Sequence, residues 1–454
     1  MNKIILRIIL FFFIAAFFLK GVCVLDPDFG WHLRMGQVIF TSGIPTHDLF
    51  SFTMVRYPFV DHEWLTNVLI YLVYNATGMV GVSALFTGVF FATILILARE
   101  GKNSLLEIVF LVAASLLGFG GVRPQVLGWL FLVLWMRELA MTKHDNRHLF
   151  LLQLLWVNAH GSFFLGIAIY VVFKIVELFQ KKKNKTSFLM IFLLFFATLV
   201  NPYTYRMWWE VFMQLTDGSL RWRVMEWLPG ILIFDISFWV YSCIFFSLFI
   251  KFYKKISVFQ KTVAILFFLM ALSTARNMPL FLLVSSVIVF VLWRAFERSV
   301  PKQKTEPFLL FKRVIVGICI FVSFMSVYLY LVLYKPIDEA YPGGAVKYMQ
   351  SQKLTGNTFS LYEWGGYIIW KLPDNKIFVD GRMPSWRWVQ NDTHQSNNAD
   401  FEYREIVKGK RSFNYYRDIY HIRYVLINKD KNKQALFKHY KKIYEDKTSI
   451  LYKL

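Results

Sequence analysis

Long apolar runs separated by short polar segments dominate the pattern of this chain. Most runs hold roughly 15–22 residues with few charges, which is the length an α-helix needs to cross a bilayer. The pattern predicts about 11 membrane spans, of which the fifth is short. The predicted spans are Ile4–Val24, Met79–Ala98, Ser104–Phe119, Gln125–Ala140, Leu149–Val157, Ser162–Phe179, Phe188–Val200, Ile231–Ile250, Thr262–Ala275, Leu280–Trp293 and Val314–Tyr334.

Two polar segments interrupt this pattern. Between the first two spans, the mixture of apolar and polar residues over Trp31–Ile39 predicts an amphipathic helix on the membrane surface. The apolar but short stretch Trp64–Tyr74 predicts a second interfacial helix. Four tryptophans within Tyr203–Gly230 predict an interfacial loop.

From Pro336 onward the composition is that of a soluble domain. Apolar periodicity there predicts two helices, Tyr341–Gln350 and Gln434–Lys442, and four short strands. The predicted strands are Asn357–Leu361, Ile377–Asp380, Tyr424–Asn428 and Ser449–Leu454. We therefore expect a polytopic α-helical membrane protein, with a transmembrane domain over 1–335, a first outer loop over 25–78, and a small α/β domain over 336–454.

The net charge of +22 would indicate nucleic-acid binding in a soluble protein. Here much of the excess lies in short loops between apolar runs, so membrane topology explains it and nucleic acid is not an expected partner. Lysine-rich loops contain Lys102, Lys143, Lys181, Lys182, Lys183, Lys185, Lys251, Lys254, Lys255, Lys261, Lys302 and Lys304. The positive-inside rule then places the N-terminus in the cytoplasm and the C-terminal domain outside a cytoplasmic (inner) membrane. No small-x-small cleavage site follows the first run, so we expect an uncleaved first span.

In this topology the unusual polar residues gather at the outer ends of spans. Asp26-Pro-Asp28 follows the first span directly. Its carboxylates suit a hard metal ion or general-base catalysis, but Asp and Pro are also common where a helix stops. In Asp61-His62-Glu63, capping of the following helix is the favoured interpretation for Asp61, while His62 and Glu63 are candidates to line a site.

Arg123 and Arg276 each lie at the outer end of an apolar run and precede a proline. A guanidinium binds phosphate in a fork geometry, whereas snorkelling to lipid headgroups is the alternative interpretation. His160-Gly-Ser162 is typical of a turn at a span end. Glu363-Trp-Gly-Gly-Tyr367 and Val379–Trp386 suit a saccharide surface or tight turns, and we favour turns.

Three segments of the first outer loop resemble bacterial GT-C-fold integral membrane glycosyltransferases, in particular their mannosyltransferase-like and aminoarabinose-transferase-like branch. These segments are Asp26-Pro-Asp-Phe-Gly-Trp-His-Leu-Arg-Met-Gly36, Ile44-Pro-Thr-His-Asp-Leu-Phe-Ser-Phe-Thr53 and Val60-Asp-His-Glu-Trp64. Asn158-Ala-His-Gly161, Arg276-Asn277, Trp364-Gly-Gly-Tyr367 and Val379-Asp-Gly-Arg382 are similar to later segments of that group.

The resemblance implies inverting transfer of a hexosyl or pentosyl group from a polyprenyl-phosphate-linked donor to an envelope glycan, lipid or protein, on the outer face of the membrane. It maps the catalytic base onto Asp28, or alternatively Asp26, and the donor-phosphate ligands onto Arg123 and Arg276. His32, Arg34, His62, Glu63, His160 and Asn277 are expected to line the site. A divalent cation such as Mg²⁺ or Mn²⁺ stays open, with Asp26 and Asp28 as its candidate ligands.

Two other classes of function are compatible with a membrane chain of this kind. A transporter or flippase of lipid-linked glycans would place charged groups near the membrane midplane, often in two related halves, and no matching halves are visible. A non-enzymatic envelope assembly protein would keep the scaffold without needing the acids and arginines.

Overall fold

The computed structural model describes residues 3–101, 106–140, 146–180, 187–299, 305–332, 336–387 and 396–454. The chain forms two compact units. Unit 1 comprises Met1–Val22, Met79–Tyr205 and Gly218–Leu333, and unit 2 comprises Cys23–Gly78, Arg206–Asp217 and Tyr334–Leu454. The predicted domains 1–335 and 336–454 stay a prediction; in the structure the first outer loop groups with the segment from Tyr334 onward.

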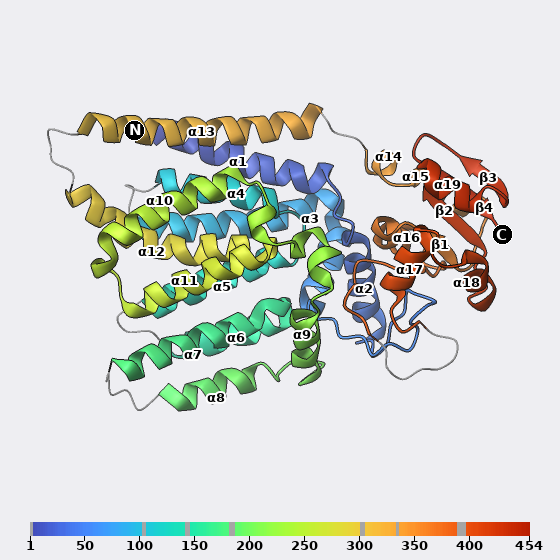
Figure 1. Ribbon diagram of the computed structural model, residues 1–454, viewed down its shortest axis with the longest axis horizontal. Coiled ribbons are helices and arrows are strands. Elements are labelled where there is room, and N and C mark those ends of the chain that lie inside the picture. The colour runs from blue at the N-terminus through green and yellow to red at the C-terminus, as the bar shows by residue number, and fades with distance from the viewer. Residues whose placement is uncertain are drawn as a thin grey trace. The chain divides into compact units, whose positions relative to one another are not determined.

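Unit 1 is helical, and the apolar runs account for its helices (Figure 1). Its α-helices are α1 (Lys3–Cys23), α4 (Leu106–Phe119), α5 (Gln125–Ala140), α6 (Asn146–Ala159), α7 (Phe164–Phe179), α8 (Ser187–Ala197), α10 (Ile236–Phe252), α11 (Val258–Ser273), α12 (Met278–Ser299) and α13 (Thr305–Val332). Its 3₁₀ turns are η1 (Gly161–Phe163), η2 (Leu220–Trp222), η3 (Met225–Trp227), η4 (Gly230–Leu232), η5 (Tyr253–Lys255) and η6 (Ala275–Asn277).

Helix α12 is central to unit 1, where it packs against α4, α5, α10 and α11 (Figure 1). Phe281 of α12 contacts the rings of Phe245 and Phe246 from α10 and of Phe268 from α11. Capping fixes where the neighbouring helices begin, since the Asp235 side chain accepts the N–H of Phe238 at the start of α10. Helix α10 therefore begins at Ile236, five residues later than the predicted eighth span, because η4 and the Asp235 cap occupy the first residues of that span.

Four helical stretches in the described part of the chain are long and apolar enough to cross a membrane: Trp64–Arg99, Gly161–Phe179, Ile236–Lys255 and Ala275–Ser299. Three shorter apolar helices cover Val109–Phe119, Val258–Ser273 and Val316–Val332. The protein is thus an α-helical membrane protein, while the count of 11 spans stays a prediction. Of the lysines that set the predicted orientation, Lys102, Lys143, Lys181, Lys182, Lys183, Lys185, Lys302 and Lys304 lie outside the described residues.

Helix α3 (Trp64–Gly101) belongs to both units and breaks at Gly78, whose φ of 66° lies in the left-handed region. The break separates the two helices that the sequence predicts, one over Trp64–Tyr74 and one from Met79. Glycine tolerates this backbone conformation, so the chain can leave one helix and enter the next within a single residue.

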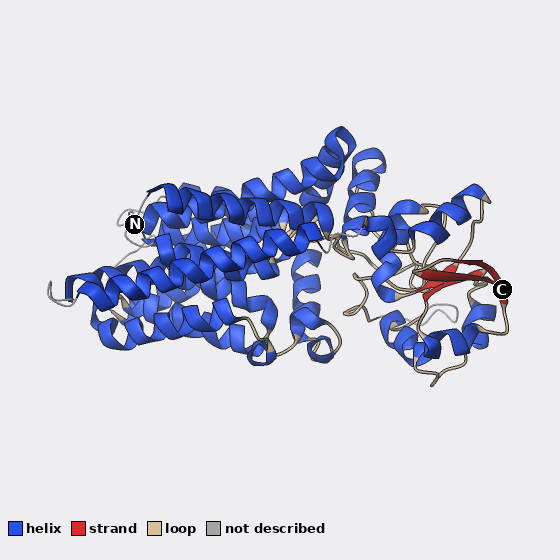
Figure 2. Cartoon of the chain, turned by 90° about the horizontal axis from the view of Figure 1, so that it is seen from above, coloured by secondary structure: helices blue, strands red, loops and turns tan. Residues whose placement is uncertain are grey.

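Unit 2 consists of short helices and one sheet. Its helices are α2 (Phe29–Ser42), α9 (Arg206–Thr216), α14 (Ile337–Ala340), α15 (Gly343–Ser351), η8 (Tyr362–Trp364), α16 (Gly365–Lys371), α17 (Ala399–Val407), α18 (Phe413–Ile419) and α19 (Lys431–Phe437). Its strands are β1 (Thr358–Ser360), β2 (Tyr424–Asn428), β3 (Lys441–Glu445) and β4 (Ser449–Lys453). Figure 2 shows the strands as one sheet, whose order is β1-β2-β4-β3.

The sheet confirms most of the predicted C-terminal elements. Strand β1 pairs with β2 in parallel, and β2–β4 and β4–β3 pair antiparallel. The predicted strand at Ile377–Asp380 is wrong, because only Ile377 forms bridges there, one to Ser51 and one to Thr358. The predicted helix over Gln434–Lys442 ends at Phe437, and the residues from Lys441 onward form β3.

Two expectations for polar segments need correction. Helix α2 forms as predicted, but it is not a surface helix: Phe29, Trp31, Leu33 and Met35 are all buried inside unit 2, and the helix packs on α16. The tryptophan-rich segment Tyr203–Gly230 is not only loop, because it contains α9 and the 3₁₀ turns η2 and η3. Trp209 and Phe212 on α9 remain 61% and 54% exposed, which agrees with the interfacial part of that prediction.

Candidate active site

The Asp28 carboxylate lies at the N-terminus of α2, where the helix dipole favours a negative charge. The backbone N–H of Asp28 donates to Oδ1 of Asp26 over 2.9 Å, which folds the Asp-Pro-Asp sequence into a turn. The indole Nε1 of Trp31, one helical turn further on, donates to Oδ1 of Asp28 over 3.0 Å. Half-buried, the Asp28 side chain is therefore oriented by its own loop and helix.

The C-terminal segment packs directly on this turn. A Cβ atom placed on Gly366 would lie 2.1 Å from the backbone oxygen of Pro27, and one on Gly30 would lie 1.9 Å from the backbone oxygen of Gly366. Gly365 and Gly366 therefore do not form the predicted turn; they open α16. Gly366 allows α16 to approach α2 without a side chain between the backbones, while a Cβ on Gly365 would lie 2.6 Å from the backbone oxygen of Val379. Gly381 covers Asp28 itself, because a Cβ there would lie 1.8 Å from Oδ1 of Asp28.

Gly381 lies in the turn Asp380–Met383, where the N–H of Met383 bonds to the Asp380 carbonyl over 3.2 Å, as the turn interpretation predicts. The next residue, Arg382, anchors this turn. Its Nη2 lies 2.6 Å from Oδ2 of Asp380 and its Nη1 lies 2.8 Å from Oδ1 of Asp48. Asp48 comes from the first outer loop, so the two ion pairs join that loop to the C-terminal segment.

The Arg382 cluster, formed by Asp48, Asp380 and Arg382, is buried among the rings of Trp31, Phe50, Phe59 and Trp386. Burial disfavours the charged guanidinium, but the carboxylates of Asp380 and Asp48 outweigh it and hold the pKa of Arg382 above its ordinary value. Asp48 also accepts the N–H groups of Phe50 and Ser51. Each charged side chain of the cluster thus has an ion-pair partner that fixes its position.

A second polar cluster follows on the first loop and the start of α3. His32 Nδ1 lies 2.7 Å from Oδ1 of Asn67 and 3.7 Å from Oε2 of Glu63, and His62 Nε2 lies 3.8 Å from Oε1 of Glu63. Asp61 Oδ1 accepts the N–H of Glu63 just before α3 begins, which agrees with a capping role. Burial raises the pKa of Asp61 to about 6, although hydrogen bonds from Asn67 and Glu63 lower it in part.

Five of the predicted site residues therefore contact one another in unit 2: His32 and His62 each contact Glu63, and Asp26 contacts Asp28. Arg34 instead bonds to Gln37 on its own helix. Among the described residues, no group of three or more His, Cys, Asp or Glu side chains is arranged to hold a metal ion.

In unit 1, the two arginines predicted to bind phosphate both contact the short turn η3. The Arg123 guanidinium forms an ion pair with Glu226, and the Arg276 guanidinium lies 5.3 Å from the ring centre of Trp227. Since Glu226 and Trp227 are consecutive, Arg123 and Arg276 share one neighbourhood. The partner Glu226 was not predicted, because nothing in the sequence around it marks a contact with Arg123.

The remaining predicted residues of unit 1 have local roles. His160 Nδ1 accepts the N–H of Ser162 over 3.1 Å and caps η1, as expected for a span end. The Asn277 side chain donates to the carbonyl of Met270 and to Oγ1 of Thr274, at the end of α11. Neither contact tests whether these residues line a substrate site, so that role stays a prediction.

Sequence reasoning missed the residues of the C-terminal segment around Asp28. Burial, and next the negative charges of Asp28, Asp400 and Asp380, raise the pKa of Tyr362 well above its ordinary value. The Arg404 guanidinium lies 5.7 Å from the Tyr362 ring centre, and its Nε lies 3.0 Å from Oδ2 of Asp400. The signal that could have found them is the Trp-Gly-Gly and Asp-Gly-Arg motifs, which mark where this segment meets the first loop.

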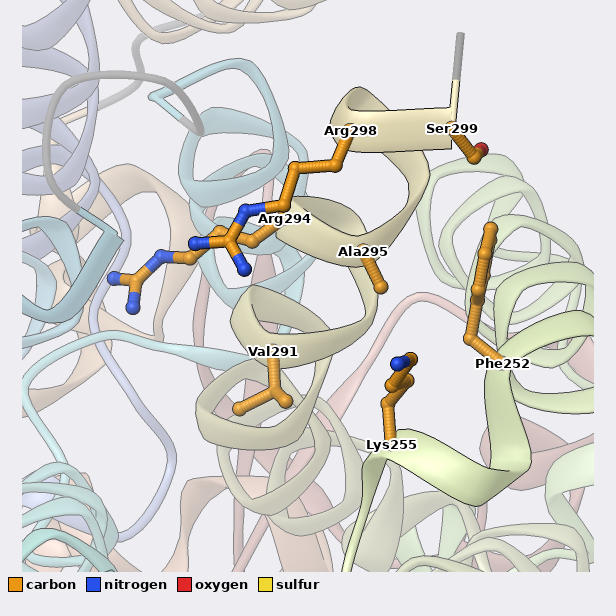
Figure 3. A pocket seen from close by; sticks show the side chains of 7 residues that line it. All are labelled: Phe252, Lys255, Val291, Arg294, Ala295, Arg298 and Ser299. Atoms are coloured by element: carbon orange, nitrogen blue, oxygen red, sulfur yellow. The ribbon is translucent and has the colours of Figure 1, made fainter.

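A separate cavity of about 470 Å³ lies in unit 1 where η5 follows α10 and α12 ends. Phe252, Lys255, Val291, Arg294, Ala295, Arg298 and Ser299 line it. In Figure 3, Ala295 faces Phe252 and Lys255, while Arg294 and Arg298 extend toward the other side of α12. The cavity contains none of the predicted site residues, and its three cations do not converge on one point.

Comparisons with known proteins reveal similarity in structure alone. Neither a scan of protein families nor a search of curated protein sequences gives a match. The oligosaccharyltransferase of Archaeoglobus fulgidus in its apo form is similar, with a TM-score of 0.57 and 12% identity over 94% of this chain and 70% of that chain. ArnT from Cupriavidus metallidurans bound to undecaprenyl phosphate is similar with a TM-score of 0.56 and 10% identity over 99% of this chain and 97% of that chain.

The archaeal oligosaccharyltransferase in complex with Zn and sulfate matches with a TM-score of 0.57 and 12% identity over 93% of this chain and 68% of that chain. The matches extend over both units of the chain. The protein has the GT-C fold, as its resemblance in sequence predicted.

Proposed function

We propose that this protein is a glycosyltransferase that moves a sugar from a polyprenyl-phosphate-linked donor to an envelope acceptor on the outer face of the membrane. The observation that carries the proposal is the Asp28 carboxylate. It is held by Trp31 and covered by Gly381, in a chain with the GT-C fold. One protein of similar fold, ArnT, was solved with undecaprenyl phosphate, which supports a lipid phosphate as the donor's leaving group.

In the proposed reaction, Asp28 acts as the general base. Its carboxylate takes the proton from an acceptor hydroxyl as that oxygen attacks the anomeric carbon of the donor sugar. The bond from the anomeric carbon to the phosphate oxygen breaks, and polyprenyl phosphate leaves with the electron pair. Attack opposite the leaving group inverts the configuration at the anomeric carbon. A half-buried carboxylate with a fixed orientation suits this role, since a base must lie within hydrogen-bond reach of the proton it takes.

Arg123 and Arg276 are proposed to hold the donor phosphate, because two guanidiniums in one neighbourhood can share a charge that grows as the phosphate leaves. The phosphate would replace Glu226 as the partner of Arg123. His32, His62 and Glu63 are proposed to line the acceptor side, since they form one polar cluster beside α2. The proposed reaction does not require a divalent cation such as Mg²⁺; if one binds, Asp26 and Asp28 are its candidate ligands.

The test is mass spectrometry of envelope glycans and lipid-linked sugars in a strain that lacks the protein. A glycosyltransferase predicts that one sugar disappears from an envelope component while its lipid-linked donor accumulates. Wild-type protein should restore the sugar, and Asp28→Asn should not, although it accumulates in the membrane to the same level. Restoration by Asp28→Asn would contradict the base role and would favour transport or assembly.

A further inference from the structure

The Asp28 carboxylate is enclosed by groups from two distant parts of the chain. Trp31, from its own helix, donates a hydrogen bond to Oδ1. The same oxygen faces Gly381 from the C-terminal segment, where an added Cβ would lie 1.8 Å away from it and 2.8 Å from Cγ of Asp28. Any side chain at position 381 would therefore occupy the place of the carboxylate.

Space, and not backbone conformation, is what requires glycine at this position. The φ of Gly381 is outside the left-handed region, so an alanine could adopt the same backbone without strain. The atom that an alanine would meet is the end of the Asp28 side chain. That carboxylate can rotate away at little cost in folding energy, but it would lose its place against Trp31.

The Arg382 cluster determines where Gly381 lies. Arg382 is only 8% exposed, and its guanidinium pairs with Asp380 on one side of the glycine and with Asp48 of the first outer loop. Its main-chain N–H also donates to Oδ1 of Asp380 over 2.9 Å, which closes the turn around Gly381. With ion pairs, backbone and four aromatic rings all engaged, this turn has little freedom to retreat from Asp28.

From this geometry we infer that Gly381 is a positioning residue for the catalytic carboxylate, and that the Arg382 cluster holds it in place. The inference rests on the proposed base role of Asp28. It assigns the C-terminal segment a part in catalysis, since that segment supplies the surface against which the base is aligned. Displacing a reacting group by about 1 Å can cost about 10²-fold in rate, so a small shift of this carboxylate would be visible in turnover.

The experiment compares Gly381→Ala with Gly344→Ala in the purified, reconstituted full-length protein. Gly344 is a matched control in the same unit. A Cβ there would lie 2.2 Å from Oδ2 of Asp446 and 2.4 Å from the hydroxyl of Tyr444. These are again the ends of side chains, one of them an aspartate, but neither residue is in the candidate site. Each variant is assayed for kcat, for KM of the lipid-linked donor and for its thermal midpoint.

We expect Gly381→Ala to lose about 10²-fold in kcat while its donor KM and thermal midpoint stay at the wild-type values. Gly344→Ala should match the wild type in kcat. A merely structural role for Gly381 would instead lower the thermal midpoint and leave the kcat of the folded fraction unchanged. That result would overturn the inference.

A second variant keeps the inference testable if Gly381→Ala does not fold. Trp31→Phe removes the indole hydrogen bond to the same carboxylate oxygen, and it should also lower kcat with an unchanged KM. Full kcat in Trp31→Phe would overturn the inference. Full kcat in Gly381→Ala, alongside an inactive Asp28→Asn, would overturn it too and leave the proposed function standing. Full activity in Asp28→Asn would remove the proposed function itself.

Discussion

Replacing Arg382 by methionine removes the cation that two buried carboxylates share. The side chains of Asp48 and Asp380 are both 0% exposed, and that of Arg382 is 3% exposed. Methionine fills similar space without charge, so Asp48 and Asp380 would remain buried and lose their partner. Breaking a buried ion pair in this way costs about 3–5 kcal/mol, because the remaining charge keeps its desolvation penalty. Two pairs break here, but they share one guanidinium, so the costs do not simply add.

At about 2–4 °C per kcal/mol for a domain of 150–250 residues, this loss corresponds to a fall of about 6–20 °C in the thermal midpoint. The assay is thermal unfolding of the detergent-solubilised protein, with all variants measured at one scan rate because membrane proteins often unfold irreversibly. Arg382→Lys should give an intermediate fall, since an ammonium group cannot reproduce the fork that contacts both carboxylates.

Arg417→Met is the matched control, because Arg417 forms an ion pair of similar length in the same unit. Its Nε lies 2.7 Å from Oδ1 of Asp418, but the two side chains are 33% and 65% exposed. Exposed pairs contribute at most about 1 kcal/mol, so this variant should unfold close to the wild-type temperature. Equal shifts in Arg382→Met and Arg417→Met would refute the reasoning that burial makes the Arg382 cluster costly to break.

Two further predictions concern Glu210 and Arg123. Burial raises the pKa of Glu210 on α9 to about 7, so the folded protein keeps a proton that the unfolded chain releases near 4.5. Stability from this group is therefore full below about pH 4.5 and falls by about 3 kcal/mol as pH rises through 7. The thermal midpoint of Glu210→Gln should then fall less than that of the wild type between pH 5 and 8, and parallel falls would contradict this. Arg123→Ala should raise the donor KM about 10–100-fold, as expected for a lost charged hydrogen bond. The control Arg221→Ala, at an exposed arginine bonded to Ser273, should leave the donor KM at the wild-type value. Equal donor KM values in Arg123→Ala and the wild type would exclude Arg123 as a phosphate ligand.

The helices of unit 1 were largely predictable from sequence, because each needs only a local apolar run of sufficient length. Helix α5 has the predicted bounds, and the break at Gly78 falls between the two helices that were predicted there. Local signals failed where tertiary contacts decide the structure. Helices α16, α17 and α18 have 7, 9 and 7 residues, too short for a clear periodic pattern, and packing within unit 2 stabilises them.

The candidate site likewise combines contacts that follow from local sequence with contacts that depend on tertiary packing. The contact between Asp28 and Trp31 is local, since residues three apart lie on one face of a helix. The pairing of Asp48 with Arg382, and the place of Gly381 over Asp28, join positions far apart in the chain. The Asp-Gly-Arg motif marks the segment that meets the first loop, but a single sequence does not give its partner residues, so the motif was interpreted as a turn and its second role was missed.

In the proposed reaction, glycosyl transfer requires the Asp28 carboxylate as its base. The most direct measurement is the release of polyprenyl phosphate from lipid-linked sugars extracted from the native membrane and incubated with purified protein in nanodiscs. We predict that wild-type protein releases it only when an envelope acceptor is present, and that folded Asp28→Asn releases none above background. Equal release by wild-type and Asp28→Asn protein, or no release by the wild type with any extracted donor and acceptor, would contradict the account.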